Sequence, residues 1–435
     1  MIVVVGIGAD GWAGLAEPAR AAILAADEIV GSVRQLALLP PTRARTRAWP
    51  SPIDPLLDEL VAGSSGSSCV LASGDPMLHG IGATLARRLP AERLVVHPHV
   101  SAFALACARL GWPAAEVSLI STVARPPEVV ARWLAPGRRI VVYASGRGGA
   151  ASVAQVLRAR GFGPSRFVVL EQLGGPAERI VDTTAKAWGD QQADPLHAVG
   201  VECRSEGGGP PLPLVPGLPD SAYDSDGQLT KRHVRALTLA ALAPLPGELL
   251  WDVGAGSGSI GIEWMRAEPT ARAIAIEARE DRAARAAANA GELGVPELDV
   301  RVGQAPGALA GLPDPDAVFI GGGLTETGLI ERCWVALRPG GRLVANAVTL
   351  EGERALIDAR AAYGGELVRI EIGNAEPVGA FTGWRMRLPI VHWSACKHAS
   401  ACKRASACER ASDRQRASAC ERASDRQRGS SKESG

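Results

Sequence analysis

The stretch that decides the fold is Leu250-Trp251-Asp252-Val253-Gly254-Ala255-Gly256-Ser257-Gly258-Ser259-Ile260. An apolar run leads to Asp252, a G-x-G-x-G turn follows, and the next residues repeat with the period of a helix. Glycines allow the backbone to turn sharply from a strand into a helix and to approach a ligand closely. The sequence therefore predicts a strand, a ligand-binding turn and a helix, in that order.

The spacing of these glycines distinguishes between cofactors. A dinucleotide fingerprint requires G-x-G-x-x-G, whereas Ser259 follows Gly258 directly. The G-x-G-x-G form with a leading acid suits a nucleoside that lacks a pyrophosphate, such as S-adenosylmethionine. A second acid, Glu277, ends the next apolar run, close to the roughly 20-residue offset at which a carboxylate holds a ribose diol. A glycine-rich turn of some other α/β fold is the alternative.

Length and composition narrow the class of protein. A chain of 435 residues has room for two or three domains. No apolar run approaches the ~20 residues of a membrane span, and the apolar start at Met1 predicts a first strand, not a signal peptide. Four widely spaced cysteines before the last 42 residues (Cys69, Cys107, Cys203 and Cys333) indicate reduced thiols and a cytoplasmic protein.

Charge is divided unevenly along the chain. The formal net charge is +1, with ten Lys and Arg against five Asp and Glu from Ser394 onward, so the tail carries +5 and the body −4. The negative body lacks the basic face with interleaved aromatic residues that a nucleic-acid partner requires. We expect a small-molecule partner, no nucleic acid, no membrane and a homo-oligomer.

Strand-like and helix-like patterns alternate along most of the chain. This alternation predicts an α/β protein with mostly parallel sheets, and a proline- and glycine-rich stretch marks a linker. A six-residue repeat with almost no large apolar side chains predicts a disordered tail. The expected domains are 1–203 (with subdomains of about 1–112 and 116–203), a linker at 204–226, a doubly wound, Rossmann-like domain of five strands at 227–393, and the tail at 394–435.

Two motifs in the first half suggest a second ligand site. Gly6-Ile7-Gly8 follows a predicted strand and formally fits a dinucleotide fingerprint, but Asp27 and Glu28 precede the second strand instead of ending it, which argues against nicotinamide or flavin. The segment Ser73 to Gly80 follows another strand, where open α/β sheets bind ligands. Asp75 in this segment is positioned to orient an amine or hydroxyl, or alternatively to cap the next helix.

These motifs resemble a known family. Gly74-Asp75-Pro76-Met77-Leu78-His79-Gly80 and the segment Val100 to Trp112 are similar to the tetrapyrrole (corrin and porphyrin) methylases. The second half resembles the decarboxylating precorrin methyltransferases of cobalamin biosynthesis, to which such a methylase domain is fused. The similar segments there are 229–235, 250–264, 318–323 and 340–351. The resemblance covers residues 1–393.

One segment departs from this family. Its members usually carry a Ser-Leu-His-Gly-Arg-like segment after the first subdomain, whereas this chain has Ser121-Thr122-Val123-Ala124-Arg125. The histidine and glycine are therefore missing and the arginine is kept. If this loop contacts substrate, the missing histidine and glycine bear on C5 methylation, the step that the first half would catalyse.

The resemblance implies two methyl transfers from S-adenosylmethionine to carbons C5 and C15 of a precorrin, with loss of carbon dioxide from the C12 acetate. It also implies cofactor contacts, some of which the glycine motif predicts independently. In the second half these are Thr230, Asp252, Gly254, Ala255, Gly256, Ser257, Gly258, Glu277, Gln304 and Ala305. In the first half they are Gly6, Gly8, Asp75, Met77 and Ser101, of which Met77 is alternatively core filler.

Substrate and proton-transfer residues are also predicted. Lys231, Arg232 and Arg235 form a basic cluster at a helix start that would pair with substrate carboxylates, unless they are a solvated helix face. Asn346 and Glu351 follow the last core strand and are candidate proton donors for decarboxylation. Glu263 is less favoured. Glu351 is alternatively an acid that interacts with a helix dipole. Methyl transfer requires no metal, and no metal site is predicted.

The sequence is compatible with three functions: a bifunctional corrin methyltransferase, a methyltransferase that acts on RNA or protein, and a non-enzymatic binding protein. A variant of the first has activity in the C-terminal half alone. We favour the bifunctional enzyme because the motifs of both halves occur in the order typical of that family.

Overall fold

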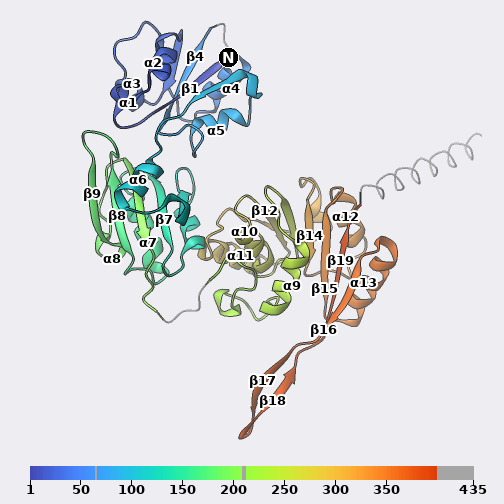
Figure 1. Ribbon diagram of the computed structural model, residues 1–435. Coiled ribbons are helices and arrows are strands. Elements are labelled where there is room, and N and C mark those ends of the chain that lie inside the picture. The colour runs from blue at the N-terminus through green and yellow to red at the C-terminus, as the bar shows by residue number, and fades with distance from the viewer. Residues whose placement is uncertain (64–65, 208–211, 399–435) are drawn as a thin grey trace, which may run out of the picture. The chain divides into compact units, whose positions relative to one another are not determined.

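The computed structural model describes residues 1–63, 66–207 and 212–398, and the chain divides into two compact units, Met1–Leu212 and Pro213–Gly435. Figure 1 shows both units, the first in blue and green and the second in yellow to red. Within the described residues, no helix is both long and apolar enough to span a bilayer.

The first half of unit 1 is a parallel sheet with the strand order β3-β2-β4-β1-β5. Its strands are β1 (Ile2–Ile7), β2 (Glu28–Gly31), β3 (Arg45–Ala48), β4 (Ser68–Ser73) and β5 (Leu94–His97). The connecting helices are α1 (Gly11–Gly14), α2 (Glu17–Leu24), α3 (Val33–Ala37), α4 (Asp54–Ala62), α5 (Ile81–Ala86) and η1 (Ala91–Arg93). Apolar side chains of β1 and β4 are fully buried between these helices, which explains their unbroken apolar sequences.

The second half of unit 1 is a mixed sheet with the order β6-β7-β10-β8-β9. Only β6 and β7 are parallel, so the expectation of a mostly parallel sheet was wrong here. For β8 and β9 the cause is the connection of residues 172–178, which is too short for a crossover helix, so these two strands pair antiparallel. The strands are β6 (Val117–Ser121), β7 (Arg139–Ser145), β8 (Arg166–Glu171), β9 (Arg179–Thr184) and β10 (Leu196–Glu202). The helices are α6 (Ala102–Leu110), η2 (Ala114–Glu116), η3 (Pro127–Trp133), α7 (Gly149–Ala159) and α8 (Ala185–Trp188).

Unit 2 is built on a seven-stranded sheet with the order β13-β12-β11-β14-β15-β19-β16. The first five strands are parallel, and β19 is antiparallel to both of its neighbours. The chain passes from β11 outward to β13 and then returns to the other side of β11, so β11 marks the topological switch point where such sheets bind ligands. The strands are β11 (Leu249–Val253), β12 (Arg272–Glu277), β13 (Asp299–Val302), β14 (Ala317–Ile320), β15 (Arg342–Ala347), β16 (Glu366–Ile370) and β19 (Ile390–Cys396).

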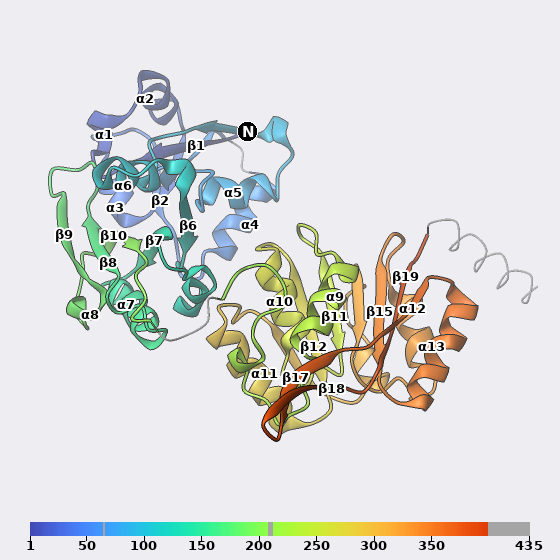
Figure 2. The same cartoon turned by 60° about the horizontal axis from the view of Figure 1, so that its bottom comes forward.

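Helices cover both faces of this sheet. Asn346 on β15 bonds to α9, whereas the next residue, Ala347, packs against Gly352 of α13, and successive strand residues face opposite sides. Figure 2 shows α9, α10 and α11 beside β11 and β12, and α12 and α13 beside β15 and β19. The helices are η4 (Asp220–Ala222), α9 (Arg232–Leu242), α10 (Ser259–Ala267), α11 (Glu280–Glu292), η5 (Gly307–Leu309), α12 (Leu329–Ala336) and α13 (Leu350–Tyr363).

Two further strands, β17 (Gly373–Val378) and β18 (Phe381–Met386), form a separate antiparallel hairpin. In Figure 1 this hairpin extends away from the seven-stranded sheet. The sequence predicted five core strands and none of these additions, because the hairpin strands carry large apolar residues without a buried face.

The expected boundaries of the second domain were displaced at both ends. Residues 213–226 pack on unit 2 instead of forming a free linker, since Leu218 and Tyr223 are buried. At the other end β19 continues to Cys396, into the first copy of the six-residue repeat. Lys397 follows it, and its Nζ donates to the carbonyl oxygens of Trp334 at 2.8 Å and Leu337 at 2.7 Å at the end of α12. The rest of the predicted tail, residues 399–435, lies outside the described residues.

Candidate functional site

The glycine turn of unit 2 lies at the carboxyl end of β11. Gly254, Gly256 and Gly258 all have left-handed backbones, with φ values of +72°, +58° and +76°. A Cβ at Gly254 would lie 2.7 Å from the backbone nitrogen of Gly322 in the loop after β14, so only glycine fits there. Gly256 is open by contrast, with 3.6 Å from an ideal Cβ to the nearest atom. The turn is thus closely packed at Gly254 and open to a ligand at Gly256.

Two carboxylates support this turn. Glu277 at the end of β12 accepts hydrogen bonds from the N–H of Gly256 at 2.8 Å and of Arg279 at 3.0 Å. Asp252 is 1% exposed and accepts from Gly261 N–H at 2.9 Å in the first turn of α10. Among the described residues its Oδ1 has no hydrogen-bond partner. The pKa of Asp252 is raised to about 7, mainly by burial; the Gly261 hydrogen bond opposes this shift and the charge of Glu277 adds to it.

The remaining predicted cofactor residues of unit 2 surround the turn. The N–H of Gly303 donates to the backbone oxygen of Glu277 at 2.9 Å, which brings Gln304 and Ala305 beside that carboxylate. Ser257 is buried, and its backbone oxygen accepts from Asn289 Nδ2 at 3.0 Å. The backbone oxygen of Gln228 is the atom nearest to an ideal Gly256 Cβ, so the segment that leads to Thr230 lies next to the glycines. The structure therefore brings the predicted cofactor residues of this unit to one edge of the sheet.

Arg235 does not belong to a substrate-binding cluster, and that prediction was wrong. Its side chain is 0% exposed, because helix α9 turns it to the face that also buries Thr238 and Leu239. The guanidinium pairs with Glu263 at 2.5 Å and donates to the backbone oxygens of Thr230 and Leu218. Arg235 therefore holds the loop at Thr230.

Glu263 is equally structural, which excludes it as a proton donor. Its carboxylate accepts from the N–H of Gly217 at 2.5 Å, from Leu218 N–H at 3.1 Å and from the Tyr223 hydroxyl at 2.8 Å. These bonds fasten residues 213–223 to α10. The other two basic residues, Lys231 and Arg232, remain partly or fully exposed at the start of α9.

The two predicted proton donors lie on different faces of the sheet. Asn346 is half-buried on the α9 side, and its Nδ2 donates to Thr238 Oγ1 at 2.9 Å. Its Oδ1 is 2.8 Å from Nδ1 of His392, so this histidine nitrogen carries the proton when the amide has this orientation. Glu351 is exposed in the first turn of α13 and lines a hollow of about 490 Å³ with Glu326, Glu331 and Arg354. The structure thus does not bring Asn346 and Glu351 together.

His392 is a residue that sequence reasoning missed. It lies on β19, opposite Asn346 in the register, and is buried. Burial lowers its pKa, and the charge of Glu366 acts in the opposite direction. No sequence signal pointed to it, because the pairing of β15 with β19 joins residues 46 positions apart.

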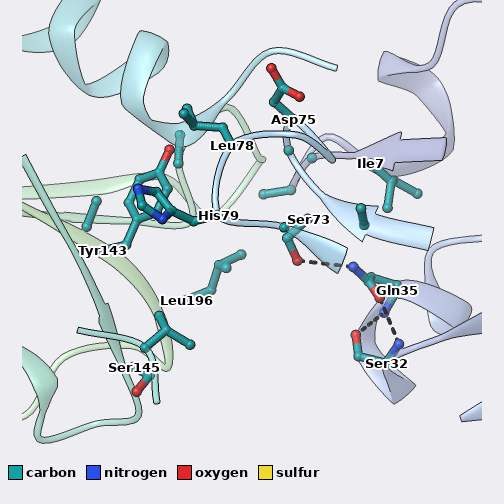
Figure 3. A pocket seen from close by; sticks show the side chains of 18 of the residues that line it. Ile7, Ser32, Gln35, Ser73, Asp75, Leu78, His79, Tyr143, Ser145 and Leu196 are labelled. Carbon is teal, nitrogen blue, oxygen red and sulfur yellow. Dashed lines mark hydrogen bonds between the residues drawn. The ribbon is translucent and has the colours of Figure 1, made fainter. Parts of the chain in front are cut away.

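Unit 1 contains a cavity of about 680 Å³ at the carboxyl ends of β1, β4 and β7. Figure 3 shows side chains from both sheets of the unit around it, among them Asp75, His79 and Tyr143. Gly8 and Asp75 line the cavity as predicted cofactor residues should, whereas Gly6, Met77 and Ser101 are not among its lining residues. Polar lining residues that the sequence did not single out include Ser32, Gln35, Tyr143 and Ser145.

Contacts within unit 1 explain several of its motif residues. Gly6 allows two loops to meet, since an ideal Cβ there would lie 2.2 Å from the backbone oxygen of Gly74. Asp75 accepts the N–H of Met77 at 2.8 Å and caps no helix, because α5 begins only at Ile81. Ser101 caps α6 by accepting from Ala104 N–H at 3.1 Å. Met77 is 48% exposed, so it is not core filler.

The segment Ser121 to Arg125, which differs from the family pattern, also reaches this cavity. Val123 and Ala124 line it, and Ala124 has a φ of +56°, a backbone conformation that favours glycine. Within the described residues, no group of three or more His, Cys, Asp or Glu side chains has the arrangement of a metal site.

The two units together define a two-domain methyltransferase: a tetrapyrrole methylase unit and a Rossmann-like unit with a glycine turn. Residues 1–188 match the family model of the tetrapyrrole (corrin/porphyrin) methylases, and residues 221–397 match that of the precorrin methyltransferase domain. The chain belongs to the precorrin-6Y C5,15-methyltransferase (decarboxylating) family, which confirms the resemblance seen in the sequence.

Two relatives by sequence support this assignment over nearly the whole chain. The precorrin-6Y C(5,15)-methyltransferase [decarboxylating] of Sinorhizobium sp is 46% identical over 397 residues, which are 91% of this chain and 96% of that protein. The protein of the same name from Mycobacterium tuberculosis (strain ATCC 25618 / H37Rv) is 46% identical over 401 residues, covering 91% of this chain and 100% of its own. The crystal structure of the C-terminal domain of precorrin-6Y C5,15-methyltransferase from Rhodobacter capsulatus is 51% identical, covers 42% of this chain and all of its own, and has a TM-score of 0.41.

Proposed function

We propose that this enzyme methylates a precorrin at C5 and C15 and removes carbon dioxide from the C12 acetate, converting precorrin-6B to precorrin-8X in cobalamin biosynthesis. Unit 1 carries out the C5 methylation, and unit 2 carries out the C15 methylation and the decarboxylation. Family membership supports the substrate class. The observation that carries the cofactor assignment is the bond from Gly256 N–H to Glu277, which joins an open glycine turn to a carboxylate at the switch point of the sheet.

The residues of unit 2 fit S-adenosylmethionine. Gly256 leaves an open backbone that a ligand can approach, and Glu277 offers carboxylate oxygens suited to a ribose diol. When bound, S-adenosylmethionine supplies a methyl group activated on a sulfonium. The protein then positions an electron-rich carbon in line with that methyl and excludes water, and such positioning can supply much of the rate.

Other residues would orient the precorrin. The side chains of Lys231 and Arg232 are accessible at the start of α9 and would pair with substrate carboxylates. Asn346, held by Thr238 and His392, lies on the last parallel strand near its carboxyl end. We propose that this rigid amide, and not Glu351, positions the group that loses carbon dioxide.

The product of the full chain tests this function. Mass spectrometry after incubation with precorrin-6B and S-adenosylmethionine should show the gain of two methyl groups with loss of carbon dioxide. Gain of one methyl with that loss would mean that unit 2 alone is active. Cofactor binding with no change in substrate mass would contradict the enzymatic proposal.

We also propose that the enzyme is a cytoplasmic homo-oligomer. The hairpin β17–β18 exposes large apolar side chains, including Phe381 at 81% and Trp384 at 78%. A two-stranded hairpin is marginally stable alone, and contact with a second copy would bury these residues. Sedimentation should show an oligomer for the native chain and a smaller species for Trp384→Glu. An unchanged sedimentation coefficient for that variant would contradict this role of the hairpin.

A further inference from the structure

We propose that His79 is the general base of unit 1, which accepts the proton that leaves the substrate carbon when it is methylated. This inference rests on the proposed C5 methylation. The methyl replaces a hydrogen on a bridging carbon of the macrocycle. A π-electron pair of the macrocycle forms the new carbon–methyl bond, while the sulfur–methyl bond breaks and its electrons stay on sulfur. The carbon must then release its hydrogen as a proton, and a base beside it accelerates that step.

The backbone presents His79 to the cavity at an energetic cost. His79 has a φ of +56°, which is uncommon for a residue other than glycine. Such strained positions persist only where the surrounding structure enforces them, and they cluster at functional sites. Here the loop is enforced by Leu78 N–H, which donates to Asp75 O at 3.2 Å, and by Gly80, where a Cβ would lie 2.6 Å from Pro76 O.

The ring of His79 faces the second sheet of unit 1. It lies edge-on to Tyr143 on β7, with ring centroids 6.2 Å apart and planes at 80° (Figure 3). Partial burial lowers the pKa of His79, and the nearby charge of Arg125 lowers it further. The imidazole is therefore neutral at pH 7 and has a lone pair available. The charged or titratable neighbours that bear on it are Arg125 after β6, Tyr143 on β7 and Asp75 on its own loop.

The other titratable side chains that line the cavity are less suited to this step. These are Arg34, Asp75, Tyr143 and His197. Arginine stays protonated, and burial raises the pKa of Tyr143 to about 12, so both lack a free base at neutral pH. A carboxylate is ordinarily a weaker base than an imidazole, and Oδ1 of Asp75 also accepts the N–H of Met77.

His197 also lines the cavity, but its own contacts bury the ring nitrogen that would have to act as the base. Its Nδ1 donates to the backbone oxygen of Asp194 at 2.6 Å, which leaves Nε2 as the nitrogen with a lone pair. That Nε2 is buried and has no hydrogen-bond partner among the described residues. His79, by contrast, is exposed and lines the same cavity, so its imidazole can reach a ligand.

The test uses the full chain with His79→Asn. Asparagine tolerates the left-handed backbone but offers no base, so the fold should be kept. With ¹³C-methyl-labelled cofactor, NMR distinguishes methylation at C5 from methylation at C15. We expect C5 methylation to fall about 100-fold, to lose its acidic pH limb and to recover in part with added imidazole, while C15 methylation stays unchanged. His97→Gln, on the edge strand β5 and not among the cavity-lining residues, should behave as the native chain does.

A second readout does not depend on turnover. NMR of histidine-labelled protein should show imidazole signals that titrate below pH 6.5, the ordinary value, because the pKa values of His79, His197 and His392 are all lowered. One of these signals should be absent in His79→Asn, and the other two should remain. An unchanged C5 rate and pH profile in the variant would overturn the proposal. A slower rate with the same pH profile and no rescue by imidazole would also overturn it, because it would mean a positional role only. If the native chain itself makes no C5-methylated product, the proposed function of unit 1 has failed instead.

Discussion

The two units build their candidate sites in different ways. In unit 2 one contiguous turn, Gly254 to Gly258, supplies the centre, and a single carboxylate, Glu277, completes it across the neighbouring strand. In unit 1 the cavity takes its lining from segments as distant as Gly8, Asp75 and Tyr143. A site made by local chain geometry can be recognised from a motif, whereas a site made by two sheets becomes visible only when both have folded.

The largest effect on stability should come from breaking the buried ion pair of Arg235 and Glu263, which holds the segment around Thr230 beside the unit 2 site. Arg235→Met leaves Glu263 charged and buried, so the unfolding free energy of unit 2 should fall by about 3–5 kcal/mol. Urea unfolding followed by hydrogen-exchange mass spectrometry of unit 2 peptides measures this loss. The control is Arg369→Met, which removes an exposed pair with Glu371 and should cost under about 1 kcal/mol. Equal losses would show that Arg235 does not anchor the unit.

The next largest effects should come from alanine substitutions of glycines, which test whether the two units work independently. Gly254→Ala places a Cβ against Gly322 and should cost unit 2 about 3 kcal/mol and most of its C15 methylation. Gly256→Ala has the same type of backbone but open space, so it should cost only about 1–2 kcal/mol. Gly6→Ala should instead impair C5 methylation, because its Cβ would clash with Gly74 O. If Gly254→Ala or Gly6→Ala abolished both methylations, the two sites would not be independent.

The third prediction concerns pH. The native state holds the proton of Asp252 up to about pH 7, whereas the unfolded chain releases it near 3.8. The native state thus binds more protons in this window, so the carboxyl contributes stability at low pH that is lost as the pH rises toward 7. Asp252→Asn should therefore gain stability relative to the native chain between pH 4 and 7, by at most about 1.4 kcal/mol per pH unit. Parallel stability profiles would show that the buried carboxyl does not titrate there.

The smallest effect should come from the exposed cations. Lys231→Ala should raise the KM for the precorrin a few-fold and leave kcat and stability nearly unchanged, because an exposed pair contributes less than about 1 kcal/mol. Steady-state kinetics at low and high salt measure this, since screening should remove the difference. A large fall in kcat would assign Lys231 to the chemistry instead.

The sequence predicted the strand, turn and helix around Gly254 because these depend on neighbours in the chain. It placed Arg235 on an accessible surface, because a basic run gives no sign of which helix face meets Glu263. It could not anticipate His392, whose pairing with Asn346 depends on an antiparallel strand at the far end of the unit. The antiparallel pairings in the second sheet of unit 1 were missed for the same reason: strand order and direction are set by connections and packing, and the alternation of apolar runs does not show them.

The ammonium group of Lys397 has a consequence for the repetitive segment in which it occurs. The fourth position of that six-residue repeat is Lys397, then Lys403, Glu409, Gln415, Glu421 and Gln427. The first copy is tied to the carbonyl oxygens at the end of α12, so glutamate at this position would set like partial charges against each other. A shortened gene that ends before Ser394 would remove the end of β19, whereas one that ends after His398 would keep β19 and the bonds of Lys397.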